Sequence, residues 1–457
     1  MGPRRSSPAG LGSAGAGIRG DVAPAVADVV RDFYDRYPYP PPVENLDSYR
    51  QVWLEPSKRR ADFHLFWPSA KYHEDLSILI AGCGTSQAAR HAVRWPEATV
   101  TGIDVSITSV RCTETLKRKH GLRNLRVHHL PIERARELGT SFDQIVCTGV
   151  LHHLADPDAG LAALRDVLKP DGVMHLMVYA PYGRTGIYML QEFCRRLGIR
   201  ATDGGIRDVI AALRKLPRGH PLERLLQDAP DFRHEAALAD ALLHPQDRAY
   251  SVAQLFDFLE SGGLQFARWV KHAPYSPHCG VVAELPHASR LAALSPVDQY
   301  SAVELFRGTM IRHSVVAHRR DNVANPVSFA DDTCLDYVPI RVSDSICVRD
   351  RLPPGAAAVL INPTHTYTDL VLPIDALELL MFEAIDGTRC IGDIVDDERG
   401  RKFFERLWHH DQIVVDATSI RRGGNQYVTR HQADSEPALG AADVSHALEA
   451  DRRRVQP

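Results

Sequence analysis

The sequence predicts an α/β fold in which a largely parallel sheet is covered by helices on both faces. Residues 77–81 form an apolar run typical of a strand that is buried on both sides. Gly82 and Gly84 follow this run directly, and residues 100–104 predict a second strand that ends in Asp104. Strand, glycine turn, helix and strand in this order indicate a βαβ unit that binds a nucleotide or an adenosine group.

The glycines and Asp104 have complementary roles in such a unit. Gly82 and Gly84 carry no Cβ, so the backbone can pass close to a ligand. Asp104 follows them at about the ~20-residue spacing at which an acidic side chain meets ribose hydroxyls. A Gly-x-Gly pair alone is weak support, but together with this carboxylate it predicts adenosine binding.

Two further segments continue the α/β pattern. Residues 142–148 predict a buried strand, and the loop Leu-His-His-Leu at 151–154 follows it. Residues 168–172, Leu-Lys-Pro-Asp-Gly, predict a turn before another strand at 173–179. Over residues 75 to 182 the chain thus resembles the class I S-adenosylmethionine-dependent methyltransferases, with four motifs in the expected order. An NAD-type enzyme would instead show a third glycine where this chain has Ser86 and Gln87.

The resemblance implies a Rossmann-like sheet, an enzyme and S-adenosylmethionine as cofactor. It places the adenine against the turn at 130–133, where Pro131 has no N–H to donate. One position departs from the family, because Ile80 stands where an acidic residue usually helps hold the methionine part. A protein that binds the cofactor without catalysis is therefore one alternative. The cofactor-binding residues implied are Ala81, Gly82, Cys83, Gly84, Asp104, Val105, Ile132, Glu133, Thr148 and Leu151.

Methyl transfer from a sulfonium is an in-line displacement, so positioning of the acceptor is the main task of the enzyme. A base is needed only when the acceptor atom carries a proton of high pKa. His153 and His152 lie in the loop after a predicted strand, where a base could act, and His153 is the first choice. Tyr179 ends the next predicted strand and Tyr182 follows it; both are further catalytic candidates, with Arg184 nearby.

The composition of the chain argues against several classes of partner. The chain has 54 basic and 57 acidic residues, a formal net charge of −3, and so no general attraction to nucleic acid or membrane. Its eight cysteines include no Cys-x-x-Cys pair, and the histidine pairs 128–129 and 409–410 lack partners at metal-ligand spacing. No apolar run reaches the ~18–20 residues of a membrane span. We therefore expect a cytoplasmic protein without a metal site.

The chain length of 457 residues indicates several domains. Residues 263–270 and 278–284 predict the two strands that complete the sheet, and three short helices with a strand near 374–416 resemble a winged-helix or PqqD-like module. The expected units are a disordered tail at 1–22, an N-terminal helical and aromatic cap at 23–74, a methyltransferase domain at 75–290 with a helical insertion at about 200–260, a smaller, mostly helical α+β domain at 300–420, and a disordered tail at 426–457.

The preferred function is methyl transfer to a small molecule. The alternative is a peptide or protein methyltransferase that recognises its acceptor through the C-terminal module. That module could equally form a lid or a homo-oligomer contact. DNA recognition is disfavoured because its second predicted helix, at 392–399, is acidic and would be repelled by phosphates.

Overall fold

The computed structural model describes residues 22–228, 234–322 and 326–418. The tails expected at 1–22 and 426–457 lie outside these ranges, except for Val22, where helix α1 begins. Within the described ranges, no helix combines the length and the apolar character needed to cross a bilayer.

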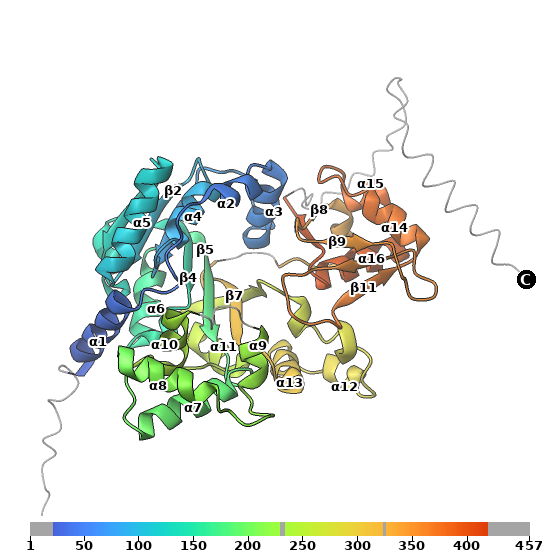
Figure 1. Ribbon diagram of the computed structural model, residues 1–457. Helices are drawn as coiled ribbons and strands as arrows, with labels where there is room; N and C mark the ends of the chain where they lie inside the picture. The colour runs from blue at the N-terminus through green and yellow to red at the C-terminus, as the bar shows by residue number, and fades with distance from the viewer. Residues whose placement is uncertain (1–21, 229–233, 323–325, 419–457) are drawn as a thin grey trace, which may run out of the picture.

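A seven-stranded mixed sheet forms the centre of the N-terminal unit (Figure 1). Its strand order is β3-β2-β1-β4-β5-β7-β6, in which β1 to β5 are parallel and β7 runs antiparallel to both of its neighbours. The strands are β1 Ser77–Ala81, β2 Thr99–Asp104, β3 Leu125–His129, β4 Phe142–Thr148, β5 Leu168–Tyr179, β6 Leu264–Trp269 and β7 Arg312–Arg319. The turn predicted at 168–172 is instead the first part of β5, where the pairing with β4 shifts register.

Alternate side chains of the buried strands pack on opposite faces, so helices cover both. On one face of the sheet, Ile78 and Ile80 of β1 pack against three helices: α3 Pro56–Phe66, α4 Gln87–Arg94 and α5 Ile107–His120. On the other face, Leu79 and Ala81 pack against α6 Pro157–Asp166, α11 Val252–Ser261 and α13 Pro296–Arg307. Because both faces are covered, β1 and β4 are buried along almost their whole length, as the sequence predicted.

Further helices extend the unit beyond the sheet. Helix α1 spans Val22–Arg36 and α2 spans Asp47–Val52. The helices after β5 are α7 Thr185–Arg196, α8 Asp203–Leu213, α9 Glu223–Asp228 and α10 Glu235–Leu243. Short 3₁₀ turns lie at Ile132–Leu138 (η1), Leu151–His153 (η2) and Ala273–Tyr275 (η4).

The strand predicted at 278–284 is wrong. Residues Gly280–Val282 form a 3₁₀ turn, and helix α12 follows at Ala288–Ala292. The strand that completes the sheet is β7, which inserts between β5 and β6 from beyond residue 290. The expected end of the catalytic domain at 290 would therefore remove a central strand, and we place the boundary after β7.

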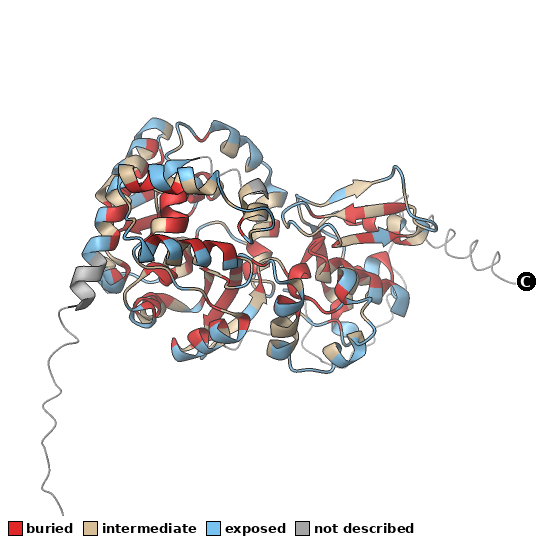
Figure 2. Ribbon diagram, turned by 60° about the horizontal axis from the view of Figure 1, so that its bottom comes forward, coloured by how far each residue is buried: buried red, intermediate tan, exposed pale blue. Residues whose placement is uncertain are grey.

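A second unit with its own apolar core follows (Figure 2). Its strands β9, β10 and β11 form one antiparallel sheet, and β8 pairs with β12 in another. The elements are β8 Val338–Arg341, β9 Ile346–Val348, β10 Ala358–Ile361, β11 Val371–Ile374, α14 Ala376–Glu383, α15 Ile391–Ile394, α16 Glu398–His409 and β12 Ile413–Asp416. Whether this unit has a winged-helix fold stays a prediction.

Apolar and charged contacts join the two units. Ala61 of α3 packs against Ile340 and Val414 of the C-terminal unit. Asp411 accepts hydrogen bonds from the backbone amides of His272 and Ala273, at 3.0 and 2.8 Å. The second unit is therefore held against the sheet that carries the site described next.

Candidate functional site

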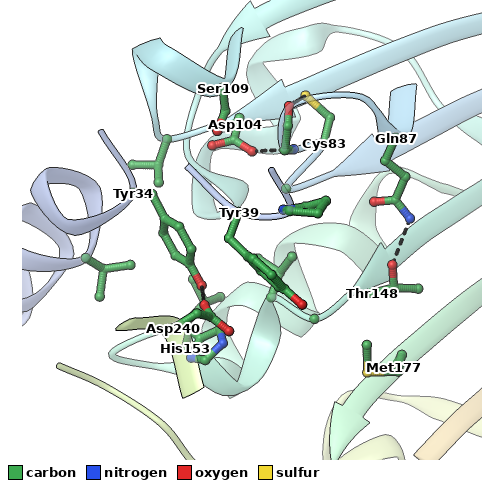
Figure 3. Close-up of a pocket in the computed structure, with 18 of the residues that line it drawn as sticks. Tyr34, Tyr39, Cys83, Gln87, Asp104, Ser109, Thr148, His153, Met177 and Asp240 are labelled. Carbon is green, nitrogen blue, oxygen red and sulfur yellow. Dashed lines mark hydrogen bonds between the residues drawn. The ribbon is translucent and has the colours of Figure 1, made fainter. Parts of the chain in front are cut away.

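A cavity of about 610 Å³ opens at the carboxyl ends of β1 to β5 (Figure 3). This volume lies within the ~300–1,000 Å³ range of pockets that hold small ligands. In open α/β sheets, ligands bind at this edge. Its lining includes Tyr34, Tyr39, Gly82, Cys83, Gly84, Gln87, Asp104, Val105, Leu130, Pro131, Ile132, Glu133, Thr148, Gly149, His153, Met177, Tyr179, Arg184, Asp240 and Arg312.

The glycine turn after β1 depends on the absence of side chains. Gly82 and Gly84 adopt positive φ angles of 71° and 55°, which favour glycine. A Cβ on Gly82 would lie 2.4 Å from a methyl carbon of Val150, which is far inside van der Waals contact. The turn is thus a cradle that any larger residue would fill, which suits close approach of a ligand.

Asp104 closes one end of the cavity at the tip of β2. Its two carboxylate oxygens accept hydrogen bonds from the backbone N–H groups of Gly84 and Ser106, each at 2.8 Å. Burial raises the pKa of this carboxyl, although the two amide hydrogen bonds act in the opposite direction. Each oxygen keeps a second lone pair, so the group can also accept hydrogen bonds from ribose hydroxyls.

The segment after β3 lines the same end. Leu130, Pro131, Ile132 and Glu133 all border the cavity, and the Ile132 side chain is buried. Ile132 begins the 3₁₀ turn η1, so the backbone turns away from the sheet at this point. An apolar side chain at this position is suited to pack against the flat face of a purine.

The opposite end of the cavity holds a polar group formed by three elements. Asp240 of α10 is 3% exposed and accepts a hydrogen bond from Tyr34 of α1 at 2.9 Å. The hydroxyl of Tyr179, at the end of β5, donates to the other carboxylate oxygen at 3.4 Å. Burial raises the pKa of Asp240 and brings this carboxylate closer to the range of a useful base.

His153 lies beside this group, as Figure 3 shows. Its Nδ1 is 2.7 Å from the carbonyl oxygen of Gln246, which can only accept, so Nδ1 carries the proton. Its Nε2 has no hydrogen-bond partner among the described residues. The same Gln246 donates its N–H to Nδ1 of His244 at 3.0 Å, which places the proton of neutral His244 on Nε2. One backbone segment thus fixes both tautomers.

The cavity gathers most of the residues that the sequence singled out. Gly82, Cys83, Gly84, Asp104, Val105, Ile132, Glu133, Thr148, His153 and Tyr179 all line it. Four do not: Ala81 and Leu151 are buried in the core, His152 is fully buried beneath the surface of the cavity, and Tyr182 is exposed elsewhere. The contribution of each residue to binding or catalysis stays a prediction.

Sequence reasoning missed the part of the site that comes from outside the central motifs. Asp240 lies in a helical segment of ordinary composition, and no local pattern marks it as a site residue. Tyr34 stands in helix α1, far along the sequence from the glycine turn. Only the tertiary structure brings these side chains to Tyr179.

Comparisons with known proteins agree with this geometry. A methyltransferase-domain family matches residues 79–174, which run from within β1 to the middle of β5. A ubiquinone biosynthesis O-methyltransferase from Dinoroseobacter shibae is 30% identical over 148 residues, covering 28% of this chain and 59% of that relative. The chain belongs to the class I S-adenosylmethionine-dependent methyltransferases. It is therefore an enzyme of this family, and its cofactor is S-adenosylmethionine.

Two other similarities extend past the core of this methyltransferase. An uncharacterized protein from Synechococcus sp. is 32% identical over 294 residues, covering 62% of this chain and 69% of that protein. The solved structure of PKMT2 from Rickettsia typhi in complex with AdoHcy is 15% identical, with a TM-score of 0.54, and covers 81% of this chain and 75% of that chain. The 81% of this chain that aligns is longer than the catalytic unit, so the likeness in fold continues into the C-terminal unit.

Proposed function

We propose that the methyl acceptor is a small molecule that binds at the Asp240 end of the cavity. The observation that carries this proposal is the buried polar group there, in which Asp240 and Arg184 are 3% and 6% exposed. The guanidinium of Arg184 lies 3.5 Å from the centre of the Tyr179 ring and so forms part of the same wall. A small polar molecule can be surrounded by such groups.

The two ends of the cavity suit different ligands. The Asp104 end offers a carboxylate, a glycine turn and an apolar side chain, which fit the adenosine part of the cofactor. Bound there, the cofactor supplies the methyl group. The Asp240 end offers hydroxyl, carboxylate and guanidinium groups, which fit an acceptor with a polar reacting atom. Tyr39 projects between the two ends in the view of Figure 3 and borders both ligands in this arrangement.

Asp240 is suited to take a proton from the acceptor. Its pKa is raised by burial, and its oxygens are oriented by hydrogen bonds from Tyr34 and Tyr179. A base with a pKa nearer to neutrality loses less driving force when it removes a proton. An acceptor with a hydroxyl or an amine group would gain from it. Exclusion of water by the surrounding side chains would support the displacement further.

A labelling experiment tests the acceptor class. The full chain is incubated with methyl-labelled S-adenosylmethionine and a cell extract, and the products are split by size. We expect label in the small-molecule fraction and less of it with Asp240→Asn. Asp257→Asn, at an exposed position of α11, is the matched control and should keep full activity. Label confined to the macromolecular fraction would favour the peptide or protein alternative.

A further inference from the structure

Three potential metal ligands meet at the wall of the cavity, behind the Asp240 group. His152 and His153 come from the 3₁₀ turn η2, and Asp247 comes from the loop after α10. One ligand atom from each residue lies within 4.8 Å of the other two. The two histidines are 0% and 3% exposed, and the Asp247 side chain is 2% exposed.

Each of the three residues has an unused ligand atom. Among the described residues, neither ring nitrogen of His152 has a hydrogen-bond partner, and the same holds for Nε2 of His153 and Oδ1 of Asp247. Buried polar atoms are nearly always paired, because an unpaired one costs about 1–3 kcal/mol. Three such residues side by side therefore indicate that something else satisfies them.

The remaining atoms of the group are held as they are in metal sites. The Nδ1–H of His153 donates to the carbonyl of Gln246 at 2.7 Å and lies 4.0 Å from Oδ1 of Asp247, so Nε2 is the ring nitrogen that has a lone pair for an ion. Oδ2 of Asp247 accepts from Arg184 at 3.2 Å and from Gln191 at 2.9 Å, which leaves Oδ1 for the centre. Hydrogen bonds of this kind commonly orient histidine and carboxylate ligands.

A second set of three, His153, Asp240 and His244, has a similar spacing but fits less well. Both oxygens of Asp240 accept hydrogen bonds from tyrosines, whereas Oδ1 of Asp247 accepts none among the described residues. His244 accepts from Gln246 at Nδ1, so its Nε2 carries a proton and has no lone pair for an ion. Hydrogen bonding thus distinguishes the two sets.

We propose that His152, His153 and Asp247 bind a divalent first-row transition ion such as Zn²⁺, Mn²⁺ or Co²⁺. Two imidazoles and one carboxylate are ligands that suit these ions better than Mg²⁺ or Ca²⁺, which prefer oxygen ligands. Bonds of ~2.1 Å need the three side chains to draw together by about 1 Å. Three protein ligands leave at least one coordination position open.

The open position would matter for methyl transfer. His153 and Arg184 line the cavity, whereas His152 and Asp247 do not, so the ion would lie in the wall behind the acceptor end. An acceptor hydroxyl would transfer its proton to Asp240. A divalent ion nearby would stabilise the negative oxygen that remains. This consequence rests on the proposed function, whereas the metal site itself does not. It assigns His153 to ion binding and leaves proton transfer to Asp240.

Metal titration of the full chain tests the site. The protein is first dialysed against a chelator and then titrated with Zn²⁺ by calorimetry and with Co²⁺ by visible absorption. We expect one equivalent of tightly bound ion. His152→Gln and the nearly isosteric Asp247→Asn should each weaken binding by at least ~10–100-fold. His244→Gln and the exposed His128→Gln should stay within about threefold of the parent chain.

Parallel measurements separate a metal defect from a folding defect. Circular dichroism checks that each variant is folded, and calorimetry with S-adenosylhomocysteine checks that the cofactor end is intact. Wild-type protein that binds the nucleoside but takes up no more ion than Asp247→Asn would overturn the metal site and leave the methyltransferase assignment untouched. Loss of ion binding in His244→Gln, with none in His152→Gln, would overturn the choice of ligands.

Discussion

Asp104 links the local backbone to the ligand. Its oxygens hold the N–H groups of Gly84 and Ser106, so the carboxylate fixes the glycine turn while it faces the cavity. A single buried side chain therefore determines both the shape of the turn and its charge. Removing the Asp104 side chain should therefore weaken cofactor binding, because the shape of the turn and its charge both change.

Asp104→Ala is expected to weaken S-adenosylhomocysteine binding by roughly 10- to 100-fold, because a charge-assisted hydrogen bond contributes ~1.5–3 kcal/mol. Isothermal titration calorimetry measures the change. Asp257→Ala, at the exposed position of α11, serves as the control and should bind normally. Equal affinity in Asp104→Ala and the parent chain would remove this residue from the site.

Gly82→Ala should damage the cradle more than a glycine substitution elsewhere. Gly139 has a similar φ of 64°, yet a Cβ there meets nothing within 4 Å, so Gly139→Ala isolates the backbone cost of ~1–2 kcal/mol. In Gly82→Ala the overlap with Val150 adds ~1–3 kcal/mol. Chemical denaturation and nucleoside binding measure both effects. Similar stability and affinity in the two variants would contradict the close contact at Gly82.

Acid should destabilise the protein through His91 of α4. Burial lowers the pKa of this histidine to about 3, whereas an unfolded chain titrates near ~6.5. Between these values the unfolded state binds more protons, so the free energy of unfolding falls as the pH falls, by at most ~1.4 kcal/mol per pH unit. His91→Gln should flatten this slope in urea denaturation at pH 7, 6 and 5. A slope equal to that of the parent chain would exclude His91 as its source.

At the scale of elements, α1 completes the cavity from outside the sheet. Asp35 near its end accepts hydrogen bonds from the Ser106 hydroxyl at 2.7 Å and the Thr108 amide at 3.2 Å. These residues begin α5, directly after Asp104. The anchor thus couples the helix that carries Tyr34 to the adenosine end of the cavity.

Asp35→Ala should loosen α1 without unfolding the sheet. We expect faster amide hydrogen exchange in residues 28–36 and weaker nucleoside binding, with partial recovery of protection when S-adenosylhomocysteine is added. Asp32→Ala is the matched control, because Asp32 is exposed on the same helix and pairs with its neighbour Arg31. Equal exchange in the two variants would show that the Asp35 contacts do not hold the helix.

The elements differ in how far the sequence predicts them. Strands β1, β2 and β4 lie next to glycines, Asp104 or the His-His loop, so local pattern and motif agree. Strand β7 has no such marker, and residues 278–284 carry an apolar run that looked equally suitable. Its pairing partners β5 and β6 lie far away in sequence. Only those long-range hydrogen bonds select it as a strand.

The residues of the candidate site also differ in how far the sequence predicts them. The adenosine end is built from consecutive residues after β1, β2 and β3, so motif spacing finds it. The acceptor end combines Tyr34, Tyr179 and Asp240 from three distant segments. Its chemistry depends on packing between helices that no local pattern specifies, and Asp240 therefore emerges only in the structure.

At the scale of the molecule, buried polar contacts join the two units. Asp411 adopts a positive φ of 53° and accepts the amides at the start of the η4 turn. Arg60 of α3 pairs with Asp416 at 2.9 Å, and Arg307 of α13 pairs with Asp369 at 3.2 Å. The C-terminal unit therefore supports the catalytic unit directly, whatever its part in acceptor choice.

Two truncated chains test how far the catalytic unit depends on the C-terminal unit for its stability. A chain that ends at residue 290 lacks β7 and should fail to fold, because β7 fills the space between β5 and β6. A chain that ends at 322 keeps all seven strands but exposes the amides that Asp411 satisfies, so it should be less stable and still bind S-adenosylhomocysteine. Gel filtration and calorimetry compare the two. A folded, nucleoside-binding chain ending at 290 would contradict the observed sheet.

A crystal structure of the full chain with S-adenosylhomocysteine would show directly which end of the cavity holds the nucleoside and which end is left for the acceptor. We predict the ribose hydroxyls at Asp104, the adenine beside Ile132 and the sulfur facing the Asp240 group. The acceptor would then approach along the line of the transferred methyl. A nucleoside bound in another cavity, or a sulfur pointing away from Asp240, would contradict the account.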